Sequence, residues 1–218
     1  MRLPLFLLLA WPSLAIAAPA PTPAQPAQPV AAAAVEGDIL SYYGGEEDSA
    51  WVVLGLSVAC VGAGVPLVAQ RSDFARGAGV PLLSLGVLEG IGAVFYVFQV
   101  RAEVAHYRAL LATDAAGFRR DELAHIEGTQ ARFVYYRAVE LALTVAGAGL
   151  ATYGFVANQD LFKGVGVGLF AIGLPFLIID TVNNGRAGRY HEQLRRFDPT
   201  LALQRDERGW RLALSGRF

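Results

Sequence analysis

The chain has 218 residues, of which 54% are hydrophobic and 17% are charged, and its formal net charge is −1. This composition is too apolar for an ordinary soluble domain, and the charge offers no basic field to a nucleic acid. We therefore expect a protein of the lipid bilayer with no nucleic-acid partner. The single cysteine, Cys60, lies in an apolar run and indicates a small packing residue.

The first 49 residues contain two segments of different composition. Residues 1–17 join Arg2, an apolar run and the small-residue site Ala15-Ile16-Ala17, which predicts a cleavable signal peptide. The alternative is an uncleaved anchor helix. Residues 18–49 begin as a Pro/Ala-rich tether and continue as an acidic flank without a base, and Asp48-Ser49 predicts the N-cap of the first span.

Four apolar stretches predict transmembrane helices in two tandem hairpins, residues 50–100 and 133–182. Each stretch has the ~20 residues that a bilayer crossing needs. The four stretches are Ala50–Ala69, Gly79–Val100, Phe133–Ala157 and roughly Lys163–Val182. The expected fold class is an all-α integral membrane protein with four transmembrane helices.

Two polar segments complete the chain. Residues 101–132 predict an extracytoplasmic helical hairpin with a break near Thr113 to Gly117. Residues 183–218 predict a short helix at Tyr190–Phe197, followed by a small C-terminal β-hairpin within Leu201–Phe218, where the largest apolar residues alternate.

The two transmembrane hairpins share a sequence pattern. Val68-Ala69-Gln70 is echoed by Val156-Ala157-Asn158 at an offset of 88 residues, and Leu85-Gly86 by Ile172-Gly173 at an offset of 87. Two spans per unit keep both copies in one orientation, which predicts a parallel repeat. Chance similarity between apolar segments is the alternative.

Export by a signal peptide predicts the orientation in a bacterial-type inner (cytoplasmic) membrane. The N-terminus, the 101–132 hairpin and the C-terminus are then outside the cytoplasm. Arg71, Arg76 and Lys163 beside the short loops agree with the positive-inside rule. The arginines of the hairpin and the tail disagree with it. We side with the signal peptide, because it acts before the later loops and because acids match the bases of the hairpin.

Two Glu-x-x-His units, Glu103/His106 and Glu122/His125, lie on the two helices expected for the hairpin. A spacing of three places Glu and His on one helix face, and paired units of this kind bind metal in di-iron carboxylate bundles. The further glutamates that such bundles use are not evident. A solvated, salt-bridged face is the alternative to an iron or zinc site, and we expect no cofactor.

A polar cluster is expected inside the predicted spans. Glu89 lies in the middle of the second span, and Arg137 and Glu140 lie in the first two turns of the third. A charge at the bilayer centre costs ~3 kcal/mol on insertion scales unless it is paired or protonated. We therefore expect Glu89, Arg137 and Glu140 to meet, either as a clamp that fixes helix register or as a proton or ion pathway.

Glycines at a spacing of four, Gly86/Gly90 and Gly164/Gly168, predict close helix packing, either within the bundle or in a homo-oligomer. The sequence contains no nucleophile elbow, phosphate loop or zinc-ligand spacing. We therefore expect a non-catalytic envelope scaffold or subunit that binds a protein partner through its extracytoplasmic hairpin and tail. The alternatives are a small transporter or channel subunit with a buried Glu, and a metal-dependent membrane enzyme.

Overall fold

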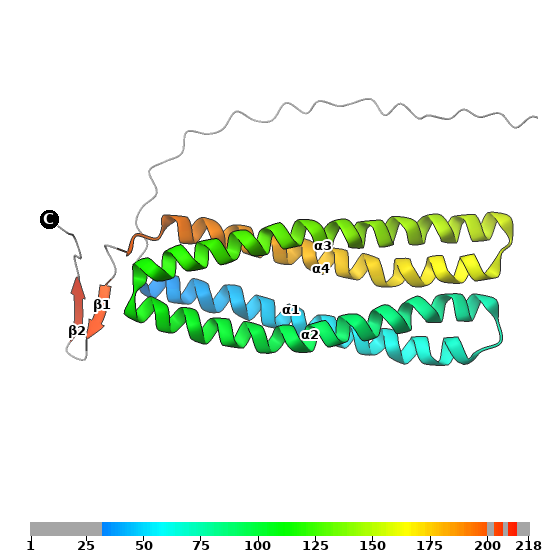
Figure 1. Ribbon diagram of the computed structural model, residues 1–218, viewed down its shortest axis with the longest axis horizontal. Coiled ribbons are helices and arrows are strands. Elements are labelled where there is room, and N and C mark those ends of the chain that lie inside the picture. Colours follow the sequence, from blue (N-terminus) through cyan, green and yellow to red (C-terminus); the bar gives the residue numbers. More distant parts are fainter. Residues whose placement is uncertain (1–31, 200–202, 207–208, 213–218) are drawn as a thin grey trace, which may run out of the picture.

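The computed structural model describes residues 32–199, 203–206 and 209–212, with side chains from 34 to 199. Figure 1 shows its four long helices, which are α1 (Ala32–Ala69), α2 (Asp73–Thr113), α3 (Ala115–Ala157) and α4 (Asp160–Arg196). The strands β1 (Leu203–Asp206) and β2 (Gly209–Leu212) pair antiparallel.

The predicted β-hairpin over Leu201–Phe218 includes these two strands, but most of that range lies outside the described residues. The hairpin therefore stays a prediction. The predicted signal peptide and most of the predicted tether also lie outside the described residues.

The four helices form two antiparallel pairs. α1 packs along α2, α3 packs along α4, and α2 lies against α4 to join the pairs. The α1–α2 and α3–α4 connections lie at one end of the elongated bundle, and the α2–α3 connection lies at the other (Figure 1). α2 contacts α3 far less than it contacts α1 or α4.

The helices are too long to lie wholly inside a membrane. They contain 38, 41, 43 and 37 residues. At ~1.5 Å per residue they extend about 55–65 Å, roughly twice the ~30 Å hydrocarbon core of a bilayer. All four are apolar enough to span it. The chain is therefore a multi-pass membrane protein, and each helix continues beyond the membrane.

The two ends of the bundle differ in surface chemistry. We name residues 50–100 and 133–182, which include both short connections, the membrane half. Its exposed side chains are largely apolar, and Phe95 and Val156 are 71% and 84% exposed. We name residues 34–49, 101–132 and 183–199 the polar half. There, ion pairs of 2.6 Å join Arg101 to Glu47 and Arg108 to Glu36, which links α2 to α1.

The polar half has its own hydrophobic core, to which all four helices contribute. Its buried side chains include Ile39 and Tyr43 on α1, Tyr107 on α2, Phe118 and Ile126 on α3, and Tyr190 and Leu194 on α4. The rings of Tyr42 and Tyr190 stack with centroids 4.6 Å apart. This half is therefore a four-helix bundle that continues the membrane half into water.

The prediction that the first helix begins after Asp48-Ser49 was wrong, because α1 begins at Ala32. Val35, Ile39, Tyr42 and Glu46 recur every three or four residues and are all buried. This spacing places one stripe of the acidic flank against the other helices. Tertiary packing of the stripe outweighs the weak helix propensity of the glycines within the flank.

The short helix predicted at Tyr190–Phe197 is not separate, because α4 runs without a break to Arg196. The segments on either side of the predicted break near Thr113 to Gly117 are likewise continuations of α2 and α3. The turn between them lies at Asp114, whose side chain accepts a hydrogen bond of 2.9 Å from the Gly117 amide.

Glycines let the chain's own helices approach closely in the membrane half. A Cβ at Gly164 would collide with the Phe74 carbonyl on α2, and one at Gly86 would crowd Cys60 on α1. Of the two alternatives for these glycines, packing within the bundle is found, and a homo-oligomer stays a prediction.

α1 and α3 end 88 residues apart, and α2 and α4 begin 87 apart, which are the offsets of the predicted repeat. The repeat itself stays a prediction.

Candidate functional site

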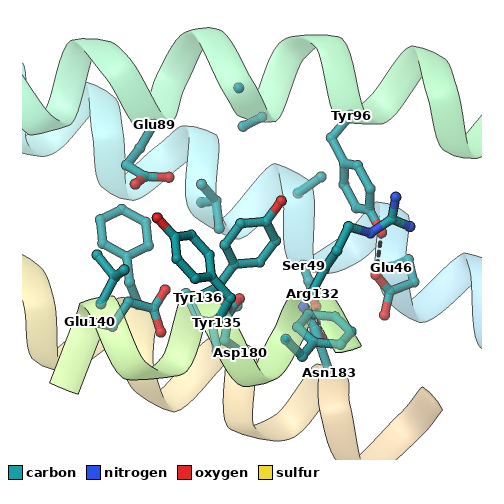
Figure 2. Close-up of a pocket in the computed structure, with 18 of the residues that line it drawn as sticks. Glu46, Ser49, Glu89, Tyr96, Arg132, Tyr135, Tyr136, Glu140, Asp180 and Asn183 are labelled. Atoms are coloured by element: carbon teal, nitrogen blue, oxygen red, sulfur yellow. Dashed lines mark hydrogen bonds between the residues drawn. The ribbon is translucent and has the colours of Figure 1, made fainter. Parts of the chain in front are cut away.

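A cavity of about 470 Å³ lies inside the bundle where the membrane half meets the polar half. Each helix contributes one carboxyl group to its lining: Glu46 on α1, Glu89 on α2, Glu140 on α3 and Asp180 on α4. Figure 2 shows Glu89 and Glu140 on opposite sides of the space, with Asp180 and Glu46 farther along it. The site is therefore a convergence of all four helices.

Helix geometry places three of these carboxyl groups in one layer. Measured along the helices from the end of the bundle with the two short connections, Glu89 lies about 24 Å away, Glu140 about 26 Å and Asp180 about 30 Å. Glu46 lies about 35 Å from that end, one to two helical turns farther toward the polar half than the other three. The layer is thus inside the membrane half, and Glu46 stands at its border.

The carboxyl groups of Glu140 and Asp180 lie within hydrogen-bonding reach of each other. Glu89 interacts electrostatically with both. One oxygen of Glu140 is buried without a hydrogen-bond donor in the described part of the chain. Carboxylates this close repel each other unless a proton or another cation lies between them. The layer is therefore suited to hold positive charge.

Three arginines surround the site. Arg137 interacts electrostatically with Glu140 and Asp180, but its Nε atom is buried without a hydrogen-bond partner among the described residues. Arg132 lines the cavity and donates a hydrogen bond of 2.8 Å to a threonine hydroxyl.

Arg186 donates hydrogen bonds of 2.8 Å to the Gly45 carbonyl and the Ser49 hydroxyl. Two of the three arginines therefore donate to neutral oxygens, and four carboxyl groups remain at the cavity.

Glu46 is the most enclosed of the four acids, with 1% of its surface exposed. Its Oε2 atom accepts a hydrogen bond of 2.6 Å from the Tyr96 hydroxyl, which Figure 2 shows as a dashed line. Its Oε1 atom has no hydrogen-bond partner among the described residues. Burial raises the pKa of Glu46, and the hydrogen bond from Tyr96 opposes that rise. The Oε1 atom has almost no accessible surface, so it is enclosed beside the cavity and not open to it.

The polar half holds the four residues predicted as metal ligands. Glu103 and His125 face each other across α2 and α3, with 3.6 Å between carboxylate oxygen and ring nitrogen. Glu122 is fully buried and accepts a hydrogen bond of 2.9 Å from the Tyr43 hydroxyl. His106 is exposed beside a tyrosine ring.

The structure therefore brings Glu103 and His125 together. Glu122 interacts electrostatically with Glu103 but accepts its hydrogen bond from Tyr43, and His106 lies on the exposed surface. Across residues 34–199, no three His, Cys, Asp or Glu side chains are placed to hold a metal ion. Burial lowers the pKa of His125, which favours its neutral form. The metal site stays a prediction, and the arrangement of the four side chains does not favour it.

The structure adds Glu46, Tyr96 and Asp180 to the predicted cluster of Glu89, Arg137 and Glu140. Asp180 could have been predicted from the sequence, because it is an acid at the end of a predicted span. Glu46 could also have been found, because its spacing from the apolar residues before it is helical.

Comparison with protein families, curated proteins and solved structures finds no match to this chain.

Proposed function

We propose that this protein is a transporter or channel subunit that binds a cation or protons in its four-carboxyl cavity. The observation that carries the proposal is the convergence of one carboxyl group from each helix. A carboxylate at the centre of a bilayer costs ~3 kcal/mol on insertion scales, and one nearer the interface costs less. Ionisable groups retained inside a membrane at such a cost mark ion and substrate pathways.

The surroundings of Glu89 favour a pathway over a register clamp. A clamp needs a fixed partner, and no hydrogen bond or ion pair to Glu89 is found among the described residues. Glu89 instead lines the cavity and interacts electrostatically with Asp180. A carboxyl group held in this way is available to a proton or a cation.

The position of the cavity supports access from the polar half. Gln99, Arg132 and Asn183, at the border of the two halves, are part of its lining. Between the cavity and the short connections, the backbones of α2 and α4 meet at Gly77 and Gly164 with no room for a Cβ. The arrangement is that of a site reached from one side of the membrane.

The test is flux through purified protein in liposomes under an imposed proton or potassium gradient. The parent should conduct above protein-free vesicles, and Glu89→Gln and Glu140→Gln should each lower the rate at least about tenfold, because glutamine keeps the shape but cannot carry the charge. The matched control is Glu127→Gln, on the exposed surface of the polar half. Absence of flux in the parent, or equal flux in all variants, would refute the proposal.

A further inference from the structure

We propose that the ligand of the cavity is an organic ammonium ion, an inference that rests on the proposed function and names its substrate class. The cavity combines carboxyl groups with aromatic rings. The aromatic side chains in its lining are Tyr96, Phe133, Tyr135, Tyr136 and Phe176. Ring faces attract ammonium groups that carry alkyl or aryl substituents, and a carboxylate supplies the opposite charge.

The rings and the carboxyl layer lie next to each other. Figure 2 shows Tyr135 and Tyr136 pointing from α3 toward α2, beside Glu89 and Glu140. The two tyrosines are 67% and 47% exposed, at the face where α2 and α3 make little contact. An amphipathic cation that approaches this face meets the rings first and the carboxyl groups behind them.

The size of the cavity points to an organic ion. Its volume of about 470 Å³ is in the range of ~300–1,000 Å³ that small-molecule sites occupy. A bare metal ion needs several oxygen ligands within about 2.6 Å. Among the described residues, no group of three His, Cys, Asp or Glu side chains is placed in that way.

Glu46 is a buried acid at the edge of the cavity. Its side chain is almost completely buried, lines the same cavity and keeps the Oε1 atom without a donor within the described part of the chain. Buried polar atoms in native structures nearly always have a partner. In this structure Oε1 has almost no accessible surface, and a proton on the carboxyl group, which burial favours, lowers the cost of the missing partner.

The charges around the cavity argue against an anionic ligand. Arg132, Arg137 and Arg186 are the bases that face the site from α3 and α4. Two of them already donate to neutral oxygens of the protein. All three arginines keep their charge, so four carboxyl groups, when ionised, against three arginines leave an excess of one negative charge, which favours a cation over an anion.

The test measures binding of benzyltrimethylammonium, whose charge does not change with pH, to the full chain in lipid nanodiscs by equilibrium dialysis. We expect saturable binding of about one ion per chain. An excess of the uncharged isostere neopentylbenzene should not displace it. Glu140→Gln and Tyr135→Ala should each weaken binding about tenfold, since each removes one attractive group.

Matched controls separate the cavity from the rest of the molecule. Glu127→Gln and Tyr153→Ala remove an exposed acid and an exposed ring far from the cavity, and both should bind as the parent does. Each variant is first checked for the parent's melting temperature. Glu46→Gln is the second acid variant if Glu140→Gln does not fold.

The outcomes distinguish this inference from the proposed function. Absence of saturable binding, displacement by the neutral isostere, or unchanged binding in the cavity variants would overturn the ammonium site. If proton or potassium flux still depends on Glu140 in that case, the transport proposal stands alone. Binding that depends on Glu140, without flux of protons, potassium or benzyltrimethylammonium itself, would support the ammonium site and refute transport.

Discussion

Glu122 shows how burial controls the chemistry of a single acid. Its carboxyl group lies in the core of the polar half, where its partner is the Tyr43 hydroxyl. Burial raises the pKa of Glu122 from its ordinary value of 4.5 to about 7. The folded protein therefore holds this proton more tightly than the unfolded chain does.

This difference predicts a pH dependence of stability. The stabilisation from protonated Glu122 is fully present below pH 4.5 and is lost as the pH rises to about 7, a change of about 3 kcal/mol. The melting temperature of the parent should fall between pH 5 and pH 8, and Glu122→Gln should reduce that fall. His125 is present in both the parent and the Glu122→Gln variant, so its contribution to the pH dependence cancels in the comparison. An equal fall in both would show that Glu122 does not titrate in this range.

Replacing Glu89 with an apolar residue should leave the protein at least as stable and still remove its function. Since it has no hydrogen-bond partner among the described residues, Glu89→Leu should be at least as stable as the parent in lipid, because leucine avoids an insertion cost of ~3 kcal/mol. The same variant should lose flux. Unfolding in detergent and liposome flux measure the two effects. A large loss of stability would identify Glu89 as a register clamp.

At the scale of the helices, the contact between α2 and α4 depends on glycine. A Cβ at Gly164 would collide with the Phe74 carbonyl, whereas one at Gly149 on α3 would meet nothing within 4 Å. Gly164→Ala should therefore destabilise the protein by about 1–3 kcal/mol. Gly149→Ala should be neutral or stabilise it by up to about 1 kcal/mol, because alanine favours the helix.

Denaturant titration followed by circular dichroism, on protein in one detergent, would compare the two variants. Because both replace a glycine in the membrane half with alanine, the difference between them reports on packing. Equal stability of the two variants would mean that α2 and α4 separate easily at Gly164.

At the scale of the whole molecule, the fold determines which parts of the chain lie on the same side of the membrane. The start of α1, the turn at Asp114 and the end of α4 lie at one end of the bundle, and both short connections lie at the other (Figure 1). From the signal peptide, we predict that a reporter active only outside the cytoplasm is active when fused after Phe218 and silent at Asp73.

A fusion at Asp114 should match the one at Phe218, since α4 ends at Arg196 at the same end of the bundle as Asp114. The reverse pattern at all three positions would mean that the arginines of the polar half determine the orientation. Different results at Asp114 and Phe218 would contradict the four-helix topology itself.

Local patterns were enough to predict the membrane-spanning character of the chain. Apolar stretches of sufficient length identified four helices that can span a bilayer, and a polar break placed a turn near Asp114. The same local view identified Glu89 and Glu140 as acids that an apolar span would not hold without a reason. These inferences needed only segment length and the cost of charge in lipid.

The tertiary structure alone decided where α1 begins and which acids meet. Glu46 and Asp180 reach the cavity because four helices of matching length place them near one height, and Glu122 is buried in the tyrosine core with the Tyr43 hydroxyl as its partner. Contacts between distant segments depend on which helix faces pack together. That choice is made by burial summed over whole helices, which no short stretch of sequence records.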